Sequence, residues 1–203
     1  CPNGSNSNTG LDINNPIKTI SKVNTLSLVS GDVVSFCTNG FWRLPTDAFP
    51  TITSGVTHNF YGNGNAPLFY GSYNDSTWIN IGGNLWKSNY TFTSGVGSLF
   101  FNNFTLWGVR NTSNLAISQG VWYLNSSNIL VVYSDGNPSL YYENIEIAVG
   151  TDMFDFANLN SVSFIGLELK AGGRHGFSGA RTSFAVINST KISFMGGDID
   201  SGT

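Results

Sequence analysis

Charged side chains are scarce in this sequence. Only 10% of the 203 residues are Asp, Glu, Lys or Arg, and the formal net charge at pH 7 is −3. Proteins that bind nucleic acid through phosphate contacts carry basic patches or strongly positive domains. The charge content therefore predicts no nucleic-acid partner.

Long apolar runs are also missing. Strongly apolar segments such as ILVVY at 129–133 are far shorter than the roughly 20 residues that an α-helix needs to cross a bilayer. No signal-peptide pattern opens the chain. We therefore expect a soluble protein without a membrane span.

Residues that favour helices are rare. Ala, Glu, Gln and Met together supply 14 residues, whereas Asn, Ser, Thr and Gly supply 91. Aromatic residues make up 14% of the chain, which distinguishes it from disordered sequences and provides material for a packed core. The composition and length predict one folded domain that is rich in strands and turns.

One segment has a helical pattern. Pro16 suits the first helical position, and Ile17, Ile20 and Val23 fall on one side of a short amphipathic helix. From residue 30 onward, short β-rich runs alternate with clusters of Gly, Asn and Ser. The chain is therefore expected to be all-β apart from a short N-terminal helix.

An apparent repeat lies near the end of the chain. SVSFIGLELKAGG at 161–173 is echoed by KISFMGGDIDSGT at 191–203, an offset of 30 residues. A strand, a glycine bend and a second strand cannot bury their own apolar side, so each such unit needs a neighbour stacked on it. The echo predicts a solenoid in which Phe164 lies directly over Phe194.

Strand alternation assigns sides to the side chains of this repeat. The residues predicted to point inward are Val162, Phe164, Leu167 and Leu169. Glu168 and Lys170 then face outward. At the usual strand spacing of about 4.8 Å, Lys170 is expected beside Asp200, and Glu168 beside Asp198.

The sequence resembles right-handed parallel β-helix proteins of the pectin-lyase-like superfamily. The opening from CPNGSNSNTG through NPIKTISKVN to LSLVSGDVVSFCTNGFWR resembles their N-terminal strand, capping helix and first coil. ITSGVTHNFYGNGNAPLFYGS resembles the following coil. GGNLWKS and QGVWYLNSSNILVVYSDGNP resemble the insert of polysaccharide-active members.

The resemblance implies an architecture for the whole chain. We expect a single β-helix domain over 1–203. It comprises an N-terminal strand and capping helix at 1–29, first coils at 30–74, an irregular β insert at 75–150 and regular coils at 151–203. Members commonly continue for many more coils, which usually hold their catalytic residues. The superfamily includes lyases, hydrolases, tailspikes and adhesins, so the resemblance is specific for the fold and leaves open whether the chain is an enzyme.

A cluster of polar residues near the C-terminal end provides candidate chemistry. Lys170, Arg174, His175 and Arg181 are the residue types that a uronate lyase uses to neutralise a carboxylate and remove a proton. Pairs among Glu168, Asp198 and Asp200 would suit a glycoside hydrolase. Glu168 and Asp198 are also a candidate Ca²⁺ site. The alternative is a solvated solenoid surface with weak ion pairs.

Aromatic residues suggest a second site. Tyr61, Tyr70, Tyr73 and Trp78 fall in one segment and are candidates for a platform on which sugar rings stack. The alternative is that Trp78 packs in the interior. His58 and His175 are distant in the sequence and are expected to be surface or turn residues.

The two cysteines, Cys1 and Cys37, have no spacing typical of a metal site. A structural disulfide in an exported protein, two unpaired thiols and a lipid-modified Cys1 all remain open. Seven Asn-x-Ser/Thr sequons are compatible with a secreted glycoprotein, but an Asn-rich and Ser-rich chain acquires several by chance.

These observations lead to two functional hypotheses. The first is an extracellular or cell-surface module that interacts with a polysaccharide, resembling the N-terminal coils of polysaccharide lyases and hydrolases. The second is a structural surface or fibre protein whose β-helix subunits stack end to end, because bare ends of a solenoid expose strand edges and apolar surface.

Overall fold

The computed structural model describes residues 3–197. Contacts divide the chain into two compact units. The first unit contains residues 1–71, 152–170 and 175–194, and the second contains residues 72–151, 171–174 and 195–203. Residues 75–150, for which an irregular insert is predicted, lie within the second unit.

The first unit begins with a short helix, α1 (Ile20–Val23). The Thr19 side chain accepts a hydrogen bond from the Lys22 backbone N–H, and Asp47 accepts from the backbone N–H groups of Ile20 and Ser21. These bonds satisfy donors that a helix start leaves without partners. The helix therefore starts at Ile20, four residues later than Pro16 predicts. A 3₁₀ turn, η1, follows further on at Leu44–Thr46.

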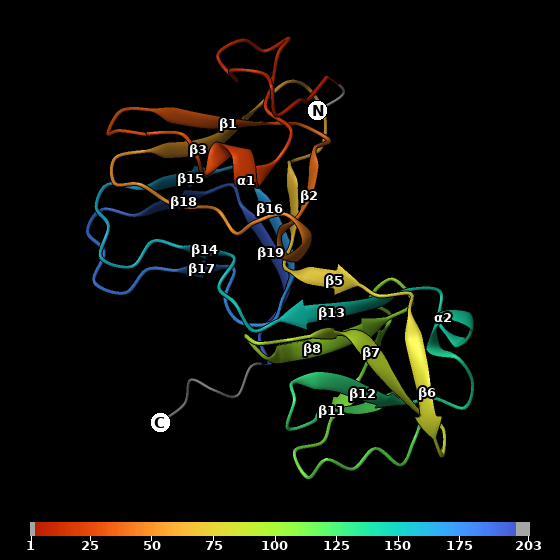
Figure 1. Ribbon diagram of the computed structural model, residues 1–203. Helices are drawn as coiled ribbons and strands as arrows, with labels where there is room; N and C mark the ends of the chain where they lie inside the picture. Colours follow the sequence, from red (N-terminus) through yellow and green to blue (C-terminus); the bar gives the residue numbers. More distant parts are fainter. Residues whose placement is uncertain (1–2, 198–203) are drawn as a thin grey trace. The chain divides into compact units, whose positions relative to one another are not determined.

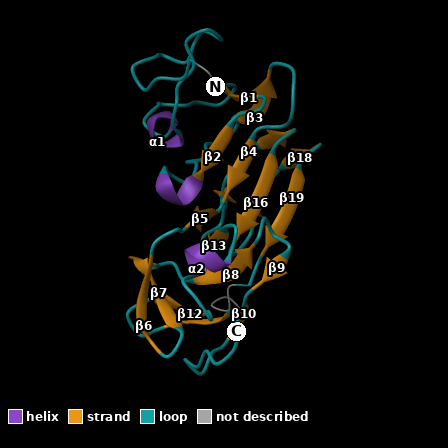
Figure 2. Cartoon of the chain, turned by 90° about the vertical axis from the view of Figure 1, so that its right-hand side faces the viewer, coloured by secondary structure: helices purple, strands orange, loops and turns teal. Residues whose placement is uncertain are grey.

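Three sheets form the faces of the solenoid in the first unit (Figures 1 and 2). One sheet contains, in order, β1 (Val33–Cys37), β3 (Thr57–Tyr61), β15 (Ser163–Ile165) and β18 (Val186–Asn188). The second contains β2 (Phe41–Arg43), β4 (Leu68–Tyr70), β16 (Glu168–Gly172) and β19 (Lys191–Met195). The third pairs β14 (Phe154–Asp155) with β17 (Phe177–Ser178).

Neighbouring strands of the first unit run parallel, as strands of successive coils must. The prediction of an all-β parallel β-helix with a short N-terminal helix is confirmed. The ladder position that runs through Val34 and His58 continues through Phe164 to Ile187. Residue 58 is thus paired with residue 164, and the second unit is inserted between them.

The coil length differs from the sequence echo. Phe154 pairs with Phe177 and Phe164 with Ile187, a spacing of 23 residues. The predicted stacking of Phe164 on Phe194 is wrong, because Phe164 lies in β15 and Phe194 in β19, which belong to different sheets.

Bends with left-handed backbone recur at this true spacing. The pairs with positive φ are Asn158 and Arg181, Ser161 and Phe184, Gly166 and Ser189, and Ala171 and Phe194. The residue types within each pair are unrelated. The repeat is therefore a repeat of backbone conformation, and the matching letters 30 residues apart are coincidental.

Apolar and aromatic side chains fill the interior of the first unit. The four residues predicted to point inward, Val162, Phe164, Leu167 and Leu169, are all fully buried. His58 is also buried, with its ring stacked on Phe164 at 5.1 Å between centroids. The prediction of a surface or turn position for His58 is therefore wrong, since its position in β3 points into the core.

The second unit consists of two sheets with mostly antiparallel pairing. One sheet is ordered β5 (Ser72–Asn74), β13 (Ile145–Val149), β8 (Val96–Phe101) and β9 (Leu106–Trp107). The other is ordered β10 (Val109–Arg110), β11 (Val121–Leu124), β12 (Ile129–Tyr133), β7 (Leu85–Thr91) and β6 (Trp78–Gly82). A short helix, α2 (Pro138–Tyr141), has Asn137 as its N-cap.

Candidate functional site

The outer face of the sheet formed by β2, β4, β16 and β19 concentrates aromatic and basic side chains. Trp42, Phe69 and Leu169 share one ladder position and are buried. Because side chains alternate along a strand, the flanking positions point outward. These hold Arg43, Tyr70 and Lys170 in one row, and Phe41, Leu68 and Glu168 in the other.

Tyr70 is at the centre of this face. The Arg43 guanidinium carbon lies 4.8 Å from the centroid of the Tyr70 ring, and the Lys170 Nζ lies 5.8 Å from it. Phe41 makes an edge contact with Tyr70 at 5.3 Å between centroids and is 54% exposed. We call Phe41, Arg43, Tyr70 and Lys170 the aromatic–cation cluster. Both distances to Tyr70 are within the range of cation–π attraction.

The cluster continues toward β19. Lys170 Nζ lies 5.4 Å from the centroid of the Phe194 ring. Lys191 Nζ forms an ion pair with Glu168 Oε1 at 2.8 Å, and the Lys191 backbone N–H donates to the Leu167 carbonyl. The described neighbour of Glu168 in the next coil is thus a lysine. Asp198 and Asp200 lie outside the described residues, so the predicted Ca²⁺ site at Glu168 and Asp198 stays a prediction.

The other candidate catalytic residues lie on different elements. His175 precedes β17 and its Nδ1 lies 2.9 Å from Asp152 Oδ1. Arg181 is exposed at the left-handed bend between β17 and β18. Arg174 belongs to the second unit. Within the first unit, only Lys170 of the predicted lyase residues therefore lies in the aromatic–cation cluster, and catalytic roles for the four stay predictions.

The candidate stacking residues are divided between the two units. Tyr61, at the end of β3, and Tyr70, in β4, belong to the first unit. Tyr73 and Trp78 belong to the second, where Tyr73 stacks on Tyr90 at 4.8 Å and Trp78 is buried. Of the four, Tyr70 is the one that lies between two basic side chains in the described contacts.

The sequence analysis missed two members of the cluster, Phe41 and Arg43. The signal was present, because FWR at 41–43 has the alternation of a strand with its tryptophan inward. What the sequence did not provide was the register that places Arg43 opposite Tyr70.

Two buried carboxylates in the second unit were also missed. Glu146 accepts hydrogen bonds from Ser72 Oγ and Asn74 Nδ2, and Asp75 accepts from the Ser88 and Thr77 side chains. Glu146 and Asp75 are each 3% exposed. These bonds supply the partners that buried carboxylates require. In the described part of the chain, no cluster of three or more His, Cys, Asp or Glu residues could hold a metal ion.

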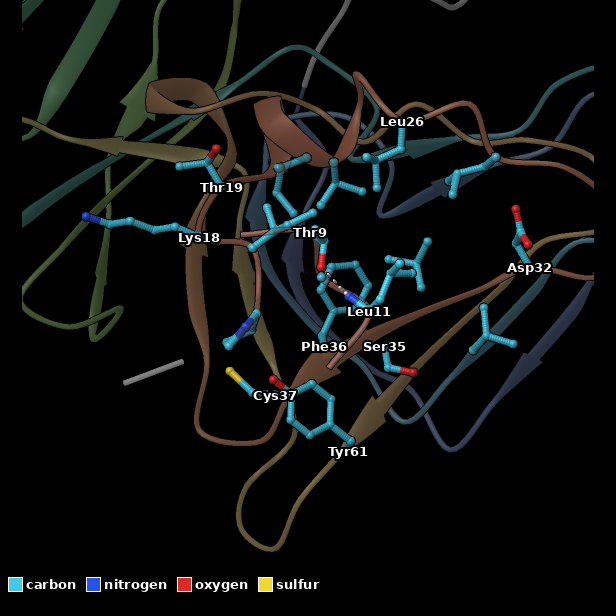
Figure 3. Close-up of a pocket in the computed structure, with 18 of the residues that line it drawn as sticks. Thr9, Leu11, Lys18, Thr19, Leu26, Asp32, Ser35, Phe36, Cys37 and Tyr61 are labelled. Atoms are coloured by element: carbon cyan, nitrogen blue, oxygen red, sulfur yellow. Dashed lines mark hydrogen bonds between the residues drawn. The ribbon is translucent and has the colours of Figure 1, made fainter. Parts of the chain in front are cut away.

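A cavity of about 640 Å³ lies between the N-terminal segment and β1 (Figure 3). Its lining is largely apolar and includes Leu11, Phe36 and Trp42. Tyr61 also lines it, and burial raises the pKa of its hydroxyl. Cys37, at the end of β1, is disulfide-bonded. Cys1 lies outside the described residues, so the Cys1 to Cys37 pairing stays a prediction.

Comparisons with known proteins bear on the fold. No family model and no curated protein sequence matches the chain. A structure described as "The complex structure of XylC with xylose" matches with a TM-score of 0.55 and 14% sequence identity, over 84% of this chain and 34% of that chain. The chain thus spans about a third of the length of that structure. This likeness supports the β-helix and does not name the pectin-lyase-like superfamily. No helix in the described residues is long and apolar enough to span a membrane.

Proposed function

We propose that this chain is an extracellular, carbohydrate-interacting β-helix of the pectin-lyase-like type, and that its aromatic–cation cluster binds an acidic polysaccharide. The observation that supports this most is the position of Tyr70 between Arg43 and Lys170. An aromatic ring offers a flat apolar surface to a sugar ring, and the two cations beside it suit a carboxylate on the same sugar.

Charge composition favours an acidic glycan over a neutral one. The four strands of this sheet contain three basic residues, Arg43, Lys170 and Lys191, and one acidic residue, Glu168, although the whole chain has a net charge of −3. A guanidinium group also matches a carboxylate with two parallel hydrogen bonds. Uronate sugars are the class of ligand that combines a ring with such a group.

The proposal concerns binding and not catalysis. A lyase needs its base and its cations to converge on one sugar. In the described part of the first unit, Lys170 and Arg181 belong to different faces of the coil. An extracellular location is part of the proposal because Cys37 is disulfide-bonded, and stable disulfides are typical of exported proteins. The XylC structure, which contains xylose according to its description, is compatible with a sugar ligand.

Affinity electrophoresis in gels that contain polygalacturonate, alginate or xylan tests the proposal. The full chain should be retarded by the two uronate polymers and less by xylan, and added salt should reduce the retardation. Tyr70→Ala should lose most of the retardation. Tyr141→Ala provides a matched control, because Tyr141 is an exposed tyrosine on α2 in the other unit.

Two results would overturn the proposal. One is the absence of retardation by either uronate polymer. The other is equal retardation of Tyr70→Ala and the unmodified chain, which would place binding elsewhere. Retardation by xylan alone would reject the acidic ligand class.

A further inference from the structure

The ladder β1, β3, β15 and β18 has two edge strands, β1 and β18. Half of the backbone N–H and C=O groups of an edge strand point away from its sheet and can accept another strand. In a parallel sheet, the edge groups of the last strand match those of the first strand, because each added strand keeps the same direction. The two edges of this sheet are therefore complementary to each other.

Apolar side chains at the β18 end are exposed although their ladder neighbours are buried. Phe164 is fully buried, whereas its neighbour Ile187 in the last described coil is 47% exposed. Leu169 is fully buried, whereas Ile192 in the adjacent strand β19 is 47% exposed. Phe184, at the bend before β18, is 83% exposed. Exposed apolar surface of this kind marks an interaction site.

The β1 end offers apolar surface at the corresponding positions. Val34 continues the ladder of Ile187, and Trp42 is on the buried ladder of Phe69 and Leu169. Both residues line the cavity beside β1, which is the part of this end that the N-terminal segment leaves unfilled (Figure 3). Val33, one residue before Val34, is 55% exposed.

The bends at the two ends also match. Gly31, Gly55, Ser161 and Phe184 form one series of left-handed residues, linked by the hydrogen bonds from Gly31 to Gly55, from Gly55 to Asn160 and from Ser161 to Ser183. Phe184 stands at one end of the series and Gly31 at the other. No heavy atom lies within 4 Å of a Cβ built on Gly31. The β1 end therefore has open space at the position where a stacked coil would bring the Phe184 ring.

Charges at the two ends have opposite signs. The last described coil, residues 175–194, carries Arg181 and Lys191 and no acidic residue. Asp12 and Asp32 line the cavity at the β1 end. Lys18 also contributes to that lining, but its side chain extends away from the other lining residues (Figure 3). Like charges therefore do not oppose contact between the two ends.

We propose that copies of this chain associate head to tail, with β18 of one copy adding in parallel to β1 of the next. Ile187 and Ile192 would enter the cavity at the β1 end of the neighbour, and Phe184 would lie over Gly31. Such a contact uses two different surfaces and does not close on itself, so it leads to an open series of subunits. This inference does not depend on glycan binding.

Variants that block one end at a time test the proposal. Ile187→Asp blocks the β18 end, and Val33→Asp blocks the β1 end. Both side chains are about half exposed, so the fold should tolerate the changes, and circular dichroism checks this. In sedimentation velocity over a wide concentration range, the full unmodified chain should form species larger than dimers, and each variant alone should stay monomeric.

Mixing the two variants is the decisive experiment. Each retains one intact end, so an equimolar mixture should form heterodimers and nothing larger. Leu140→Asp, which changes an 87% exposed residue of α2, should leave the self-association of the chain unchanged. A chain that stays monomeric at all concentrations would overturn the proposal. So would dimers of Val33→Asp alone, because they would show that two β18 ends meet.

Discussion

The imidazole of His58 stacks on the ring of Phe164, with 5.1 Å between ring centroids and 24° between the planes. His58 is 2% exposed, and its Nδ1 has no hydrogen-bond partner. Burial lowers the pKa of His58 to about 4, although a backbone hydrogen bond with Ser163 acts in the opposite direction. A histidine is therefore held neutral within the solenoid.

The stability of the fold should decrease as the pH falls from 6.5 to 4. In this range the unfolded chain binds a proton at His58 and the folded chain does not, so acid favours unfolding. The pKa difference corresponds to about 3 kcal/mol at pH 4. Urea unfolding at a series of pH values should show a smaller decrease for His58→Phe than for the unmodified chain. His175→Asn changes an exposed histidine and should retain the full decrease; equal slopes for all three proteins would contradict the assignment.

Left-handed bends should tolerate glycine better than neighbouring strand positions. Ser189 has a φ of 51°, which costs a residue with a side chain roughly 1 kcal/mol and costs glycine little. Asn188 is the adjacent strand residue without this conformation. Ser189→Gly should be more stable than Asn188→Gly by about 1–2 kcal/mol in thermal unfolding. The reverse order would mean that the bend is not left-handed.

Removing the partner of a buried carboxylate should destabilise the second unit. Ser88 Oγ donates to Asp75 Oδ2 at 2.7 Å, and both residues are nearly inaccessible. Ser88→Ala leaves a buried acceptor with one bond fewer, at a cost of about 1–3 kcal/mol. The exposed Ser127 gives a control, since Ser127→Ala should change the free energy of unfolding by less than about 0.5 kcal/mol.

The surface ion pair should contribute little. The Lys191 side chain is 70% exposed and Glu168 is 22% exposed, so water and salt screen the pair. Lys191→Met should lower the free energy of unfolding by less than about 1 kcal/mol. A larger loss that persists in high salt would point to packing of the lysine stem.

The cations beside Tyr70 should control binding of acidic glycans. Arg43→Ala and Lys170→Ala should each weaken polygalacturonate binding by roughly 3–10-fold, and both should reduce its dependence on salt. Lys22→Ala, in α1, is the matched control for a general loss of positive charge. Isothermal titration measures all three. An equal effect of the three variants would indicate a nonspecific charge effect.

Alternation of apolar and polar residues was enough to predict much of the first unit. The inward positions Val162, Phe164, Leu167 and Leu169 and the outward positions Glu168 and Lys170 are as predicted, because a strand places successive side chains on opposite faces. The coil length was not predictable in this way. Ser161 and Phe184 share a backbone conformation and nothing else, so their equivalence leaves no trace in residue type.

The candidate site shows the same limit. Lys170 and Tyr70 were chosen from their residue types, but Arg43 is their neighbour only through the pairing of β2 with β4 and of β4 with β16. Tyr70 and Lys170 are separated by 100 residues of sequence, and no local pattern specifies the register of such distant strands. Composition also gave no sign that His58 would be buried, since its neighbours in THNFYG include both polar and aromatic residues.

The pairing of β3 with β15 has a consequence for how this protein is made. His58 meets Phe164 only after more than a hundred intervening residues have been synthesised. Contacts between segments so distant in the chain slow folding, because a long loop must close before they contribute stability. On the ribosome, the first two coils must therefore wait with an incomplete interior until β15 emerges. That delay makes the nascent chain a natural client for chaperones that shield apolar surface.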